Sequence, residues 1–312
     1  MLLPPPAKLL LAISGGPDSI VLGHLLRSSV YTVYWGHVDH QLRKTSIRDA
    51  RFVKTLAHSW GIPCAMAKVS VRSWARKKKV SLEEAARDQR YILLEKMARK
   101  FHCEAIVTAH HADDQAETVL FNFLRGTGPK GLAGIPSQRV LPSQKHILLR
   151  PMLSIPRETI LHYAYNEKLS FCQDESNDDQ QFMRNHIRHH WLPLLEKEFP
   201  GLKTRLGQMA ELFRQEDDYW EKEISGIESR LLKKIRLGYR LDLLSFLGYH
   251  RNLGSRILRR VMTDLAYRDI DTVYTHVFSS HSSFELVLPN EWRVVRQGRW
   301  LMLFPKGGRR GE

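Results

Sequence analysis

The sequence has few cysteines, and none of them are paired. Cys64, Cys103 and Cys172 are its only cysteines in 312 residues, and no two of them have a CxxC spacing. This excludes a disulfide framework, a zinc ribbon and a cysteine-ligated cluster, and it favours a protein of the reducing cytoplasm. Long apolar runs are also missing, since the stretch at residues 8–13 is too short for a signal-peptide core. We therefore expect neither an export signal nor a membrane span.

Acidic residues are outnumbered by basic ones. The chain has 48 lysines and arginines against 33 aspartates and glutamates, which gives a formal net charge of +15. Residues 68–79 hold six basic side chains and no acidic one, and residues 230–260 hold nine basic side chains and one acidic. Two clustered basic surfaces favour an extended polyanion, so nucleic acid is the expected partner. The expected RNA contacts are Lys77, Lys78, Lys79, Arg256, Arg259 and Arg260.

A nucleotide-binding lysine is missing from the first glycine-rich loop, whose residues are Ser14, Gly15, Gly16, Pro17, Asp18 and Ser19. The loop follows an apolar run and precedes an amphipathic segment, so it predicts a strand, a turn and a helix that bind phosphate through free N–H groups and hydroxyls. A Walker loop, GxxxxGK[ST], would need a lysine here. A carboxylate beside phosphates needs a bridging divalent cation, so Asp18 predicts ATP bound with Mg²⁺. A capped Gly-Gly turn without a ligand is the alternative.

The first half of the chain alternates short β-rich runs with helical patterns, which predicts a Rossmann-like parallel sheet covered by helices. In such α/β sheets the ligand lies at the carboxyl ends of the strands. Ser46 with Asp49 and Ser81 with Glu84 resemble capping boxes that open helices. The predicted strands are residues 8–13, 31–37, 63–69, 105–109 and 146–149, and the predicted helices are residues 46–60 and 81–100.

The second half changes to long helical patterns at residues 183–198 and 202–236, followed by a mixed region with a hairpin within residues 283–304. We place the domain boundary near Pro200-Gly201. Residues 1–200 would form the nucleotide-binding catalytic domain. Residues 201–312 would form a basic domain, helical at 201–240 and mixed α/β at 241–312.

A dense group of ionisable residues follows the fourth predicted strand: His110, His111, Asp113, Asp114 and Glu117. If a helix begins at Asp113, then Asp114 and Glu117 lie one turn apart on one face, a spacing suited to a lysine ammonium or a metal. Two carboxylates that complement a helix dipole are the alternative. A metal phosphohydrolase could also use such a cluster and is the main rival.

Three further segments carry candidate residues. Arg43, after the second strand, would face the crevice as a base reader or phosphate contact, although a solvated loop is an equal alternative. Arg87 and Arg90 share a helical face that is either a substrate clamp or a salt-bridged surface. Arg184 and Arg188 would be oriented towards a phosphate by the preceding loop acids. Those loop residues are Asp174, Glu175, Ser176 and Asn177.

Taken in order, these motifs resemble the tRNA(Ile)-lysidine synthetases of the PP-loop ATP pyrophosphatase superfamily. The segments SGGPDS, HVDHQLR, EEAARDQRY, HHADDQAETVLFNFLRGTGPKGLAG, RPML and DESNDDQQFMRNHIRHHWLPLL cover about the first two-thirds of the chain. SGGPDS alone would indicate only the superfamily, and the two longest segments narrow the resemblance to lysidine formation. The chain resembles the short form, because longer members continue into a further tRNA-contacting domain.

The resemblance implies a two-step ligation on a tRNA(Ile) with a CAU anticodon. ATP adenylates the C2 oxygen of the cytidine at the first anticodon position and releases pyrophosphate. Free lysine then displaces AMP, and codon reading changes from AUG to AUA. A neighbouring histidine or aspartate would take the proton from the lysine amine. A homodimer is left open, and no other protein partner is implied.

The resemblance also implies residue roles. Residues 14–19 and His110 would bind ATP, with Asp18 next to the metal, and Asp114 and Glu117 would bind lysine. Arg87 or Arg90, and Arg184 or Arg188, would organise ATP and the cytidine, and Arg188 is also expected to contact the tRNA. Catalysis is thus assigned to Asp18, Arg87, Asp114, Glu117 and Arg184.

Other functions remain open at this point. A PP-loop tRNA thiolation enzyme would also have the glycine-rich loop and an RNA substrate, but we would expect it to contain paired cysteines. A metal-dependent phosphohydrolase would act without lysine. A noncatalytic RNA-binding module would explain the positive net charge, but it would leave the SGGPDS and HHADDQAET motifs without a role.

Overall fold

The structure is a computed structural model that describes residues 3–39, 41, 46–172, 183–279 and 283–306. The chain divides into two compact units, Met1–Arg214 and Gln215–Glu312. The division falls inside the long helix α10 (Leu202–Leu231), 14 residues beyond the predicted boundary at 200. The domain limits given above therefore stay a prediction. No helix in the described part of the chain is long and apolar enough to cross a membrane.

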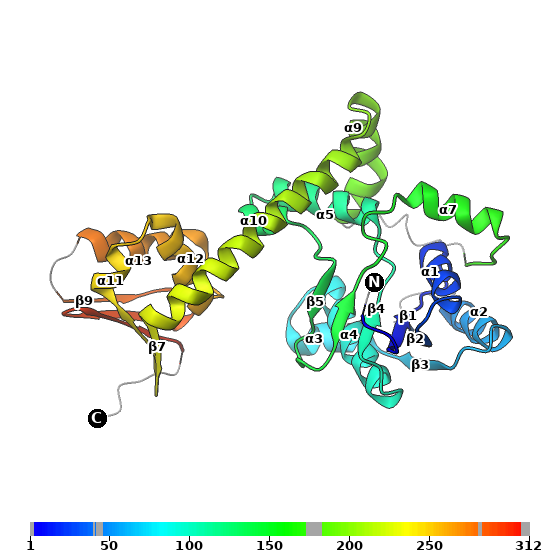
Figure 1. The fold of residues 1–312 in the computed structure, drawn as a ribbon, viewed down its shortest axis with the longest axis horizontal. Helices are drawn as coiled ribbons and strands as arrows, with labels where there is room; N and C mark the ends of the chain where they lie inside the picture. Colours follow the sequence, from blue (N-terminus) through cyan, green and yellow to red (C-terminus); the bar gives the residue numbers. More distant parts are fainter. Residues whose placement is uncertain (1–2, 40, 42–45, 173–182, 280–282, 307–312) are drawn as a thin grey trace. The chain divides into compact units, whose positions relative to one another are not determined.

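The first unit alternates strands and helices up to α10 (Figure 1). Its strands are β1 (Lys8–Ala12), β2 (Thr32–Asp39), β3 (Cys64–Lys68), β4 (Ala105–Val107), β5 (Gln138–Val140) and β6 (Ile147–Leu149). Its helices before α10 are α1 (Pro17–Arg27), α2 (Ser46–Ser59), α3 (Val71–Lys78), α4 (Leu82–Lys100), α5 (Ala112–Leu124), α6 (Pro129–Leu132), α7 (Arg157–Asn166), α8 (Met183–His186), the π-helix η2 (Ile187–Trp191) and α9 (Leu192–Glu198).

The strands form one sheet in the order β3-β2-β1-β4-β6-β5. All neighbours are parallel except β5, which pairs antiparallel with β6. The parallel α/β prediction is thus confirmed, and each of the five predicted strands is present. The strand order reverses at β1, since β2 and β3 are added on one side of β1 and β4 on the other. Such a switch point opens a crevice at the carboxyl ends of the strands.

Helices cover both faces of this sheet, which is why its strands are apolar on both sides. Leu9 and Leu11 face a cluster that includes side chains of α1, α2 and α7. Leu10 and Ile106 face the other cluster, which includes Leu94 of α4. All five side chains are at most 1% exposed. At about 1.5–3 kcal/mol for each buried leucine or isoleucine, this alternation fixes the register of the sheet.

Local sequence explains several helix boundaries. The hydroxyl of Ser81 accepts a hydrogen bond from the Glu84 amide, so the predicted start of α4 is confirmed. The predicted helix at residues 183–198 is present, but its middle is the π-helix η2. Pro193 explains the wider turn, because it has no N–H for residue 189 and its ring crowds that carbonyl. Helix α3 and strand β5 were not predicted.

The second unit packs helices on an antiparallel sheet (Figure 1). The predicted helix at 202–236 ends earlier, at Leu231, because residues 232–235 pair with β8. The predicted hairpin region contains three antiparallel strands. The elements are β7 (Leu232–Ile235), β8 (Gly238–Asp242), α11 (Leu243–Leu247), α12 (Arg251–Val261), α13 (Tyr267–Ser279), β9 (Phe284–Val287), the 3₁₀ turn η3 (Pro289–Glu291), β10 (Arg293–Gln297) and β11 (Trp300–Phe304), with the sheet order β7-β8-β11-β10-β9.

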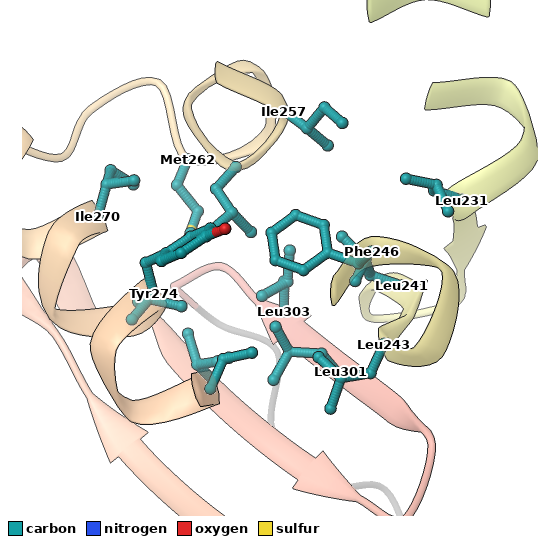
Figure 2. Close-up of a cluster of buried hydrophobic side chains, with 14 of the residues drawn as sticks. Leu231, Leu241, Leu243, Phe246, Ile257, Met262, Ile270, Tyr274, Leu301 and Leu303 are labelled. Atoms are coloured by element: carbon teal, nitrogen blue, oxygen red, sulfur yellow. The ribbon is translucent and has the colours of Figure 1, made fainter. Parts of the chain in front are cut away.

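Figure 2 shows the core of this unit, where the rings of Phe246 and Tyr274 lie beside each other with centroids 5.9 Å apart. Gly254 of α12 packs against both rings. A Cβ atom at residue 254 would lie 2.8 Å from Tyr274 Cε2 and 2.9 Å from Phe246 Cζ. Since both rings are buried, neither can move aside without disturbing the core.

We expect Gly254→Ala to lower the free energy of unfolding by about 1–3 kcal/mol, the usual cost of overpacking. Urea denaturation of the full chain measures it. Gly226→Ala in α10 is the matched control, because a Cβ there meets nothing within 4 Å. Its helix propensity should stabilise the chain by about 0.5–1 kcal/mol. Equal effects of the two substitutions would contradict the packing argument.

Candidate active site

A cavity of about 450 Å³ lies at the carboxyl ends of β1, β2 and β4, at the switch point of the sheet. Its walls come from the glycine loop, the ends of these three strands, and helices α2, α4 and α5. Segments predicted separately from the sequence thus meet in one place. The residues that carry chemistry on its walls are Ser14, Gly16, Asp18, Ser19, His37, Asp39, Asp49, Arg90, His110, Asp114 and Cys172.

The glycine loop is held in shape by its own hydroxyl groups. Ser19 is 4% exposed, and its Oγ accepts hydrogen bonds from the amides of Ser14 and Gly15 at 3.2 and 3.3 Å. The same hydroxyl donates to the Gly16 carbonyl at 3.0 Å. Gly15 has φ +96°, a conformation that other residues rarely adopt. The sequence therefore produces a tight turn that leads directly into α1, with Pro17 in its first turn.

Asp18 lies in the first turn of α1 and borders the cavity. Its Oδ2 is 3.7 Å from Nε2 of His111, and its Oδ1 is 4.0 Å from Nε of Arg157. Burial raises the pKa of Asp18 above its ordinary value, against the opposite effects of His111 and Arg157. Oδ1 accepts no hydrogen bond from any described residue. A hard oxygen ligand beside a phosphate-binding turn is the donor that Mg²⁺ prefers, so Asp18 fits the predicted metal role.

Two histidines follow β4 and differ in their surroundings. His110 borders the cavity, and its Nδ1 is hydrogen-bonded to the Thr108 hydroxyl at 2.9 Å. Burial lowers the pKa of His110 to about 4, so its imidazole is neutral at pH 7. His111 precedes α5 and is 4% exposed. It lies between carboxylates, with Nε2 3.5 Å from Asp114 and 3.7 Å from Asp18.

Asp114 and Glu117 share a face of α5, as predicted from their spacing. The sequence did not reveal that Arg188 of η2 binds both. Its Nε donates to Glu117 Oε1 at 2.6 Å, and its Nη2 donates to Glu117 Oε2 at 2.9 Å and to Asp114 Oδ1 at 3.0 Å. Glu117 is 2% exposed. Burial raises the pKa of Glu117, and the hydrogen bonds from Arg188 oppose that effect.

Arg184 lies one turn before Arg188 on the same side. Its Nη2 donates to the hydroxyl of Thr118 at 2.8 Å, and its Nε is 3.9 Å from Glu117 Oε2. Both arginines of the predicted pair therefore reach α5, but only Arg188 binds both acids.

Asp113 connects α5 to two other helices. Its Oδ1 accepts a hydrogen bond from the Arg157 amide at the start of α7, and its Oδ2 accepts one from Lys203 Nζ at 2.5 Å in α10. Burial alone would raise the pKa of Asp113, but these bonds outweigh it and the pKa is lowered. Asp113 is thus a structural anchor that the sequence did not distinguish from its neighbours.

The remaining predicted residues divide clearly. Arg90 borders the cavity, whereas Arg87 is not among the residues on its wall. The role assigned to Arg87 stays a prediction. Arg43 and the loop residues Asp174, Glu175, Ser176 and Asn177 lie outside the described residues.

The predicted RNA contacts also differ from one another. Lys77, Lys78 and Lys79 are exposed at the end of α3, with Lys78 Nζ 5.6 Å from the centre of the Trp74 ring. In the second unit, the basic residues of α12 face partners within that unit. Arg256 pairs with Asp217, Arg260 pairs with Glu221 and Glu228, and Arg259 lies over Tyr267.

Comparison with known proteins gives a consistent result. Residues 4–195 match the family model of the PP-loop domain. The chain is 33% identical over 309 residues to a tRNA(Ile)-lysidine synthase of Thermosynechococcus vestitus, covering 96% of this chain and 87% of that protein. It is 32% identical over 280 residues to the tRNA(Ile)-lysidine synthase of Geobacillus kaustophilus, covering 88% of this chain and 60% of that one.

Other relatives are much longer than this chain. A bifunctional protein TilS/HprT of Listeria monocytogenes is 33% identical over 300 residues, which are 91% of this chain but 45% of that protein. The chain thus spans about half the length of several curated relatives. Among solved structures, the U34-tRNA thiolase NcsA from Methanococcus maripaludis superposes with a TM-score of 0.56 at 19% identity, over 67% of this chain and 73% of that one. This likeness supports the fold.

The hydrogen bonds between Arg188 and Glu117 should contribute to the stability of the fold. Glu117 would keep a buried charge without its main partner in Arg188→Ala, so the free energy of unfolding should fall by about 2 kcal/mol at pH 7. The full effect of a buried pair is discounted because the Arg188 side chain is 32% exposed. Arg184→Ala removes one hydrogen bond to the Thr118 hydroxyl and a 3.9 Å contact with Glu117, so it should cost less, about 1 kcal/mol. Urea denaturation without ligand measures both.

The effect of Arg188→Ala also depends on pH, with a sign set by Glu117. A carboxyl whose folded pKa is raised stabilises the fold below its ordinary pKa and loses that contribution as pH rises through the folded pKa. Removing Arg188 raises the Glu117 pKa further, so the penalty should grow between pH 4.5 and pH 7. Adding Glu117→Gln should restore most of the loss. A pH-independent penalty, or no rescue, would refute the assignment.

Proposed function

Since this chain belongs to the PP-loop domain family and to the tRNA(Ile)-lysidine synthases, we propose that it ligates free lysine to a tRNA(Ile) with a CAU anticodon. In the first step, O2 of the cytidine at the first anticodon position attacks the α-phosphorus of ATP, and pyrophosphate leaves. In the second step, the ε-amine of lysine attacks C2 and loses a proton, and AMP leaves. The product is lysidine.

The observation that carries this proposal is the contact between a nucleotide loop and a cation-binding pair of acids. His111 lies 3.7 Å from Asp18 of the loop and 3.5 Å from Asp114 of the acid pair. A reaction that joins an adenylated base to an amine needs these two sites side by side, because the amine must reach the activated carbon within about 3–3.5 Å. A phosphohydrolase would use water as the nucleophile, so it would need no site for lysine.

ATP would lie with its phosphates at residues 14–19 and at the N-terminal end of α1. Mg²⁺ would be held by Asp18 and by phosphate oxygens, since in the described part of the chain no three or more acidic, histidine or cysteine side chains are grouped to hold a metal. The metal would neutralise the charge that develops on pyrophosphate. The neutral imidazole of His110 adds a hydrogen-bonding group to the same wall.

Lysine would replace Arg188 at the acid pair. Arg188 makes three hydrogen bonds to Asp114 and Glu117, the contacts that a lysine ammonium also seeks. Exchange of one cation for another leaves the buried charge of Glu117 neutralised throughout, so it avoids the cost of an unpaired carboxylate. The displaced guanidinium then becomes available to a phosphate or to the tRNA.

The tRNA would be contacted by the exposed lysines at the end of α3. Lys77, Lys78 and Lys79 are exposed, and Lys78 lies over the Trp74 ring, which combines positive charge with an aromatic surface. This surface belongs to the same unit as the cavity. The basic residues of α12 would contribute less, because their ion pairs already neutralise part of their charge.

Incubation with a CAU-anticodon isoleucine tRNA, ATP, Mg²⁺ and labelled lysine tests the function. We expect lysine-dependent label in the RNA and equimolar AMP. Asp18→Asn should lower both by at least a hundredfold, the usual scale for losing a charged group that stabilises the transition state. AMP formation that is independent of tRNA, with no label in the RNA, would favour the phosphohydrolase instead.

Glu117→Gln tests the lysine site separately from adenylation. Loss of a charge-assisted hydrogen bond worth about 1.5–3 kcal/mol should raise the KM for lysine roughly tenfold or more. Pyrophosphate release in the absence of lysine, which reports the first step, should change less than threefold. Glu158→Gln on exposed α7 is the control and should leave both unchanged. An unaltered lysine KM in Glu117→Gln would remove Glu117 from the lysine site.

A further inference from the structure

One carboxylate on the cavity wall has no role in the steps described so far. Asp39 ends β2 and is 4% exposed. Its Oδ1 accepts a hydrogen bond from the Gln41 amide at 2.9 Å. No described residue makes a hydrogen bond to its Oδ2. The residue borders the same cavity as the glycine loop.

A buried carboxylate oxygen without a partner is costly, and native proteins keep such groups where a ligand or water supplies the missing donor. An ionised carboxylate only accepts hydrogen bonds, so the missing partner is a hydroxyl or an N–H. The neighbouring His37 does not supply it, since its Nδ1 is hydrogen-bonded to the Ile13 carbonyl at 2.9 Å. A ligand in the cavity is therefore the natural source of the donor.

The position of Asp39 in the sheet indicates which part of the ligand supplies this hydrogen-bond donor. Strand β2 lies parallel beside β1, which leads into the glycine loop, and Asp39 is 24 residues beyond Gly15. In doubly wound sheets an acid about 20 residues beyond the glycine turn, at the end of the second strand, binds a ribose hydroxyl of a nucleotide whose phosphates lie on that turn. Apolar residues beside it, among them Gly36, Val38 and Leu94, form a wall suited to the base.

We propose that Asp39 accepts a hydrogen bond from a ribose hydroxyl of ATP and makes the site selective for ribonucleotides. This inference rests on the proposed use of ATP at this cavity. It adds a specificity residue at the opposite end of the nucleotide from Asp18. A deoxynucleotide would leave Oδ2 buried and unpaired, so the protein would reject it without any steric clash.

Equilibrium binding of nucleotides to the full chain with Mg²⁺ tests the inference, because it requires neither tRNA nor lysine. The ligands are ATP, 2′-deoxy-ATP, 3′-deoxy-ATP and inosine triphosphate. For the wild type we expect one of the two deoxynucleotides to bind on the order of tenfold to a hundredfold more weakly than ATP, the scale of a hydrogen bond to a charged group. In Asp39→Asn, ATP should weaken, and the ratio between ATP and that deoxynucleotide should fall below threefold.

Asp49→Asn is the matched control, because Asp49 borders the same cavity and also has a carboxylate oxygen without a hydrogen bond among the described residues. It should retain the wild-type ratio. The inference is overturned if the wild type binds both deoxynucleotides like ATP, or if Asp39→Asn keeps the ratio. It is also overturned if Asp39→Asn instead abolishes discrimination against inosine triphosphate, since Asp39 would then contact the base. If the wild type binds no ATP at all, the proposed function itself fails.

Discussion

The crowding of carboxylates at the start of α5 is the constraint on which the rest of the first unit depends. Three acids of this helix lie in its first two turns, and Asp18 of α1 lies next to them. Two like charges 4 Å apart repel by about 4 kcal/mol at the effective dielectric constant of a protein surface. The fold offsets this repulsion with cations from three other places in the chain. These are Arg157 of α7, Arg188 of η2 and Lys203 of α10.

This neutralisation lets the fold bury acids beside the cavity. Arg188 pairs with Glu117, although Glu117 is almost fully buried. The helix that carries Arg188 is a π-helix just before a proline, so its backbone already departs from the regular ladder. Short π-helical segments are frequent at functional sites. The contact that stabilises the fold is thus the same one that we propose lysine replaces.

The sequence was sufficient for features that depend on local patterns. Apolar runs such as residues 8–13 located the strands, the Ser81 cap located the start of α4, and the spacing of Asp114 and Glu117 placed both on one face. Features that depend on distant partners were not predictable. Arg188 and Glu117 are separated by 71 residues, and no local pattern distinguishes Arg188 from Arg184. Strand β5 has only three residues and exists because β6 pairs with it. Arg90 borders the cavity and Arg87 does not, because of how α4 is rotated, which is a tertiary property.

Counting charges along the sequence locates basic clusters, but it cannot show which of their side chains are already paired. A basic cluster attracts RNA only if its charges are not already paired, and pairing depends on elements that are distant in sequence. Arg256 and Asp217 are 39 residues apart, yet they form a 2.8 Å ion pair because α12 packs against α10. The lysines at the end of α3 differ, since the ion pairs among the described residues include none of them. Residues 68–79 also have no acidic neighbour in sequence. The exposed lysines at the end of α3 are therefore the part of the first unit that we propose faces the RNA.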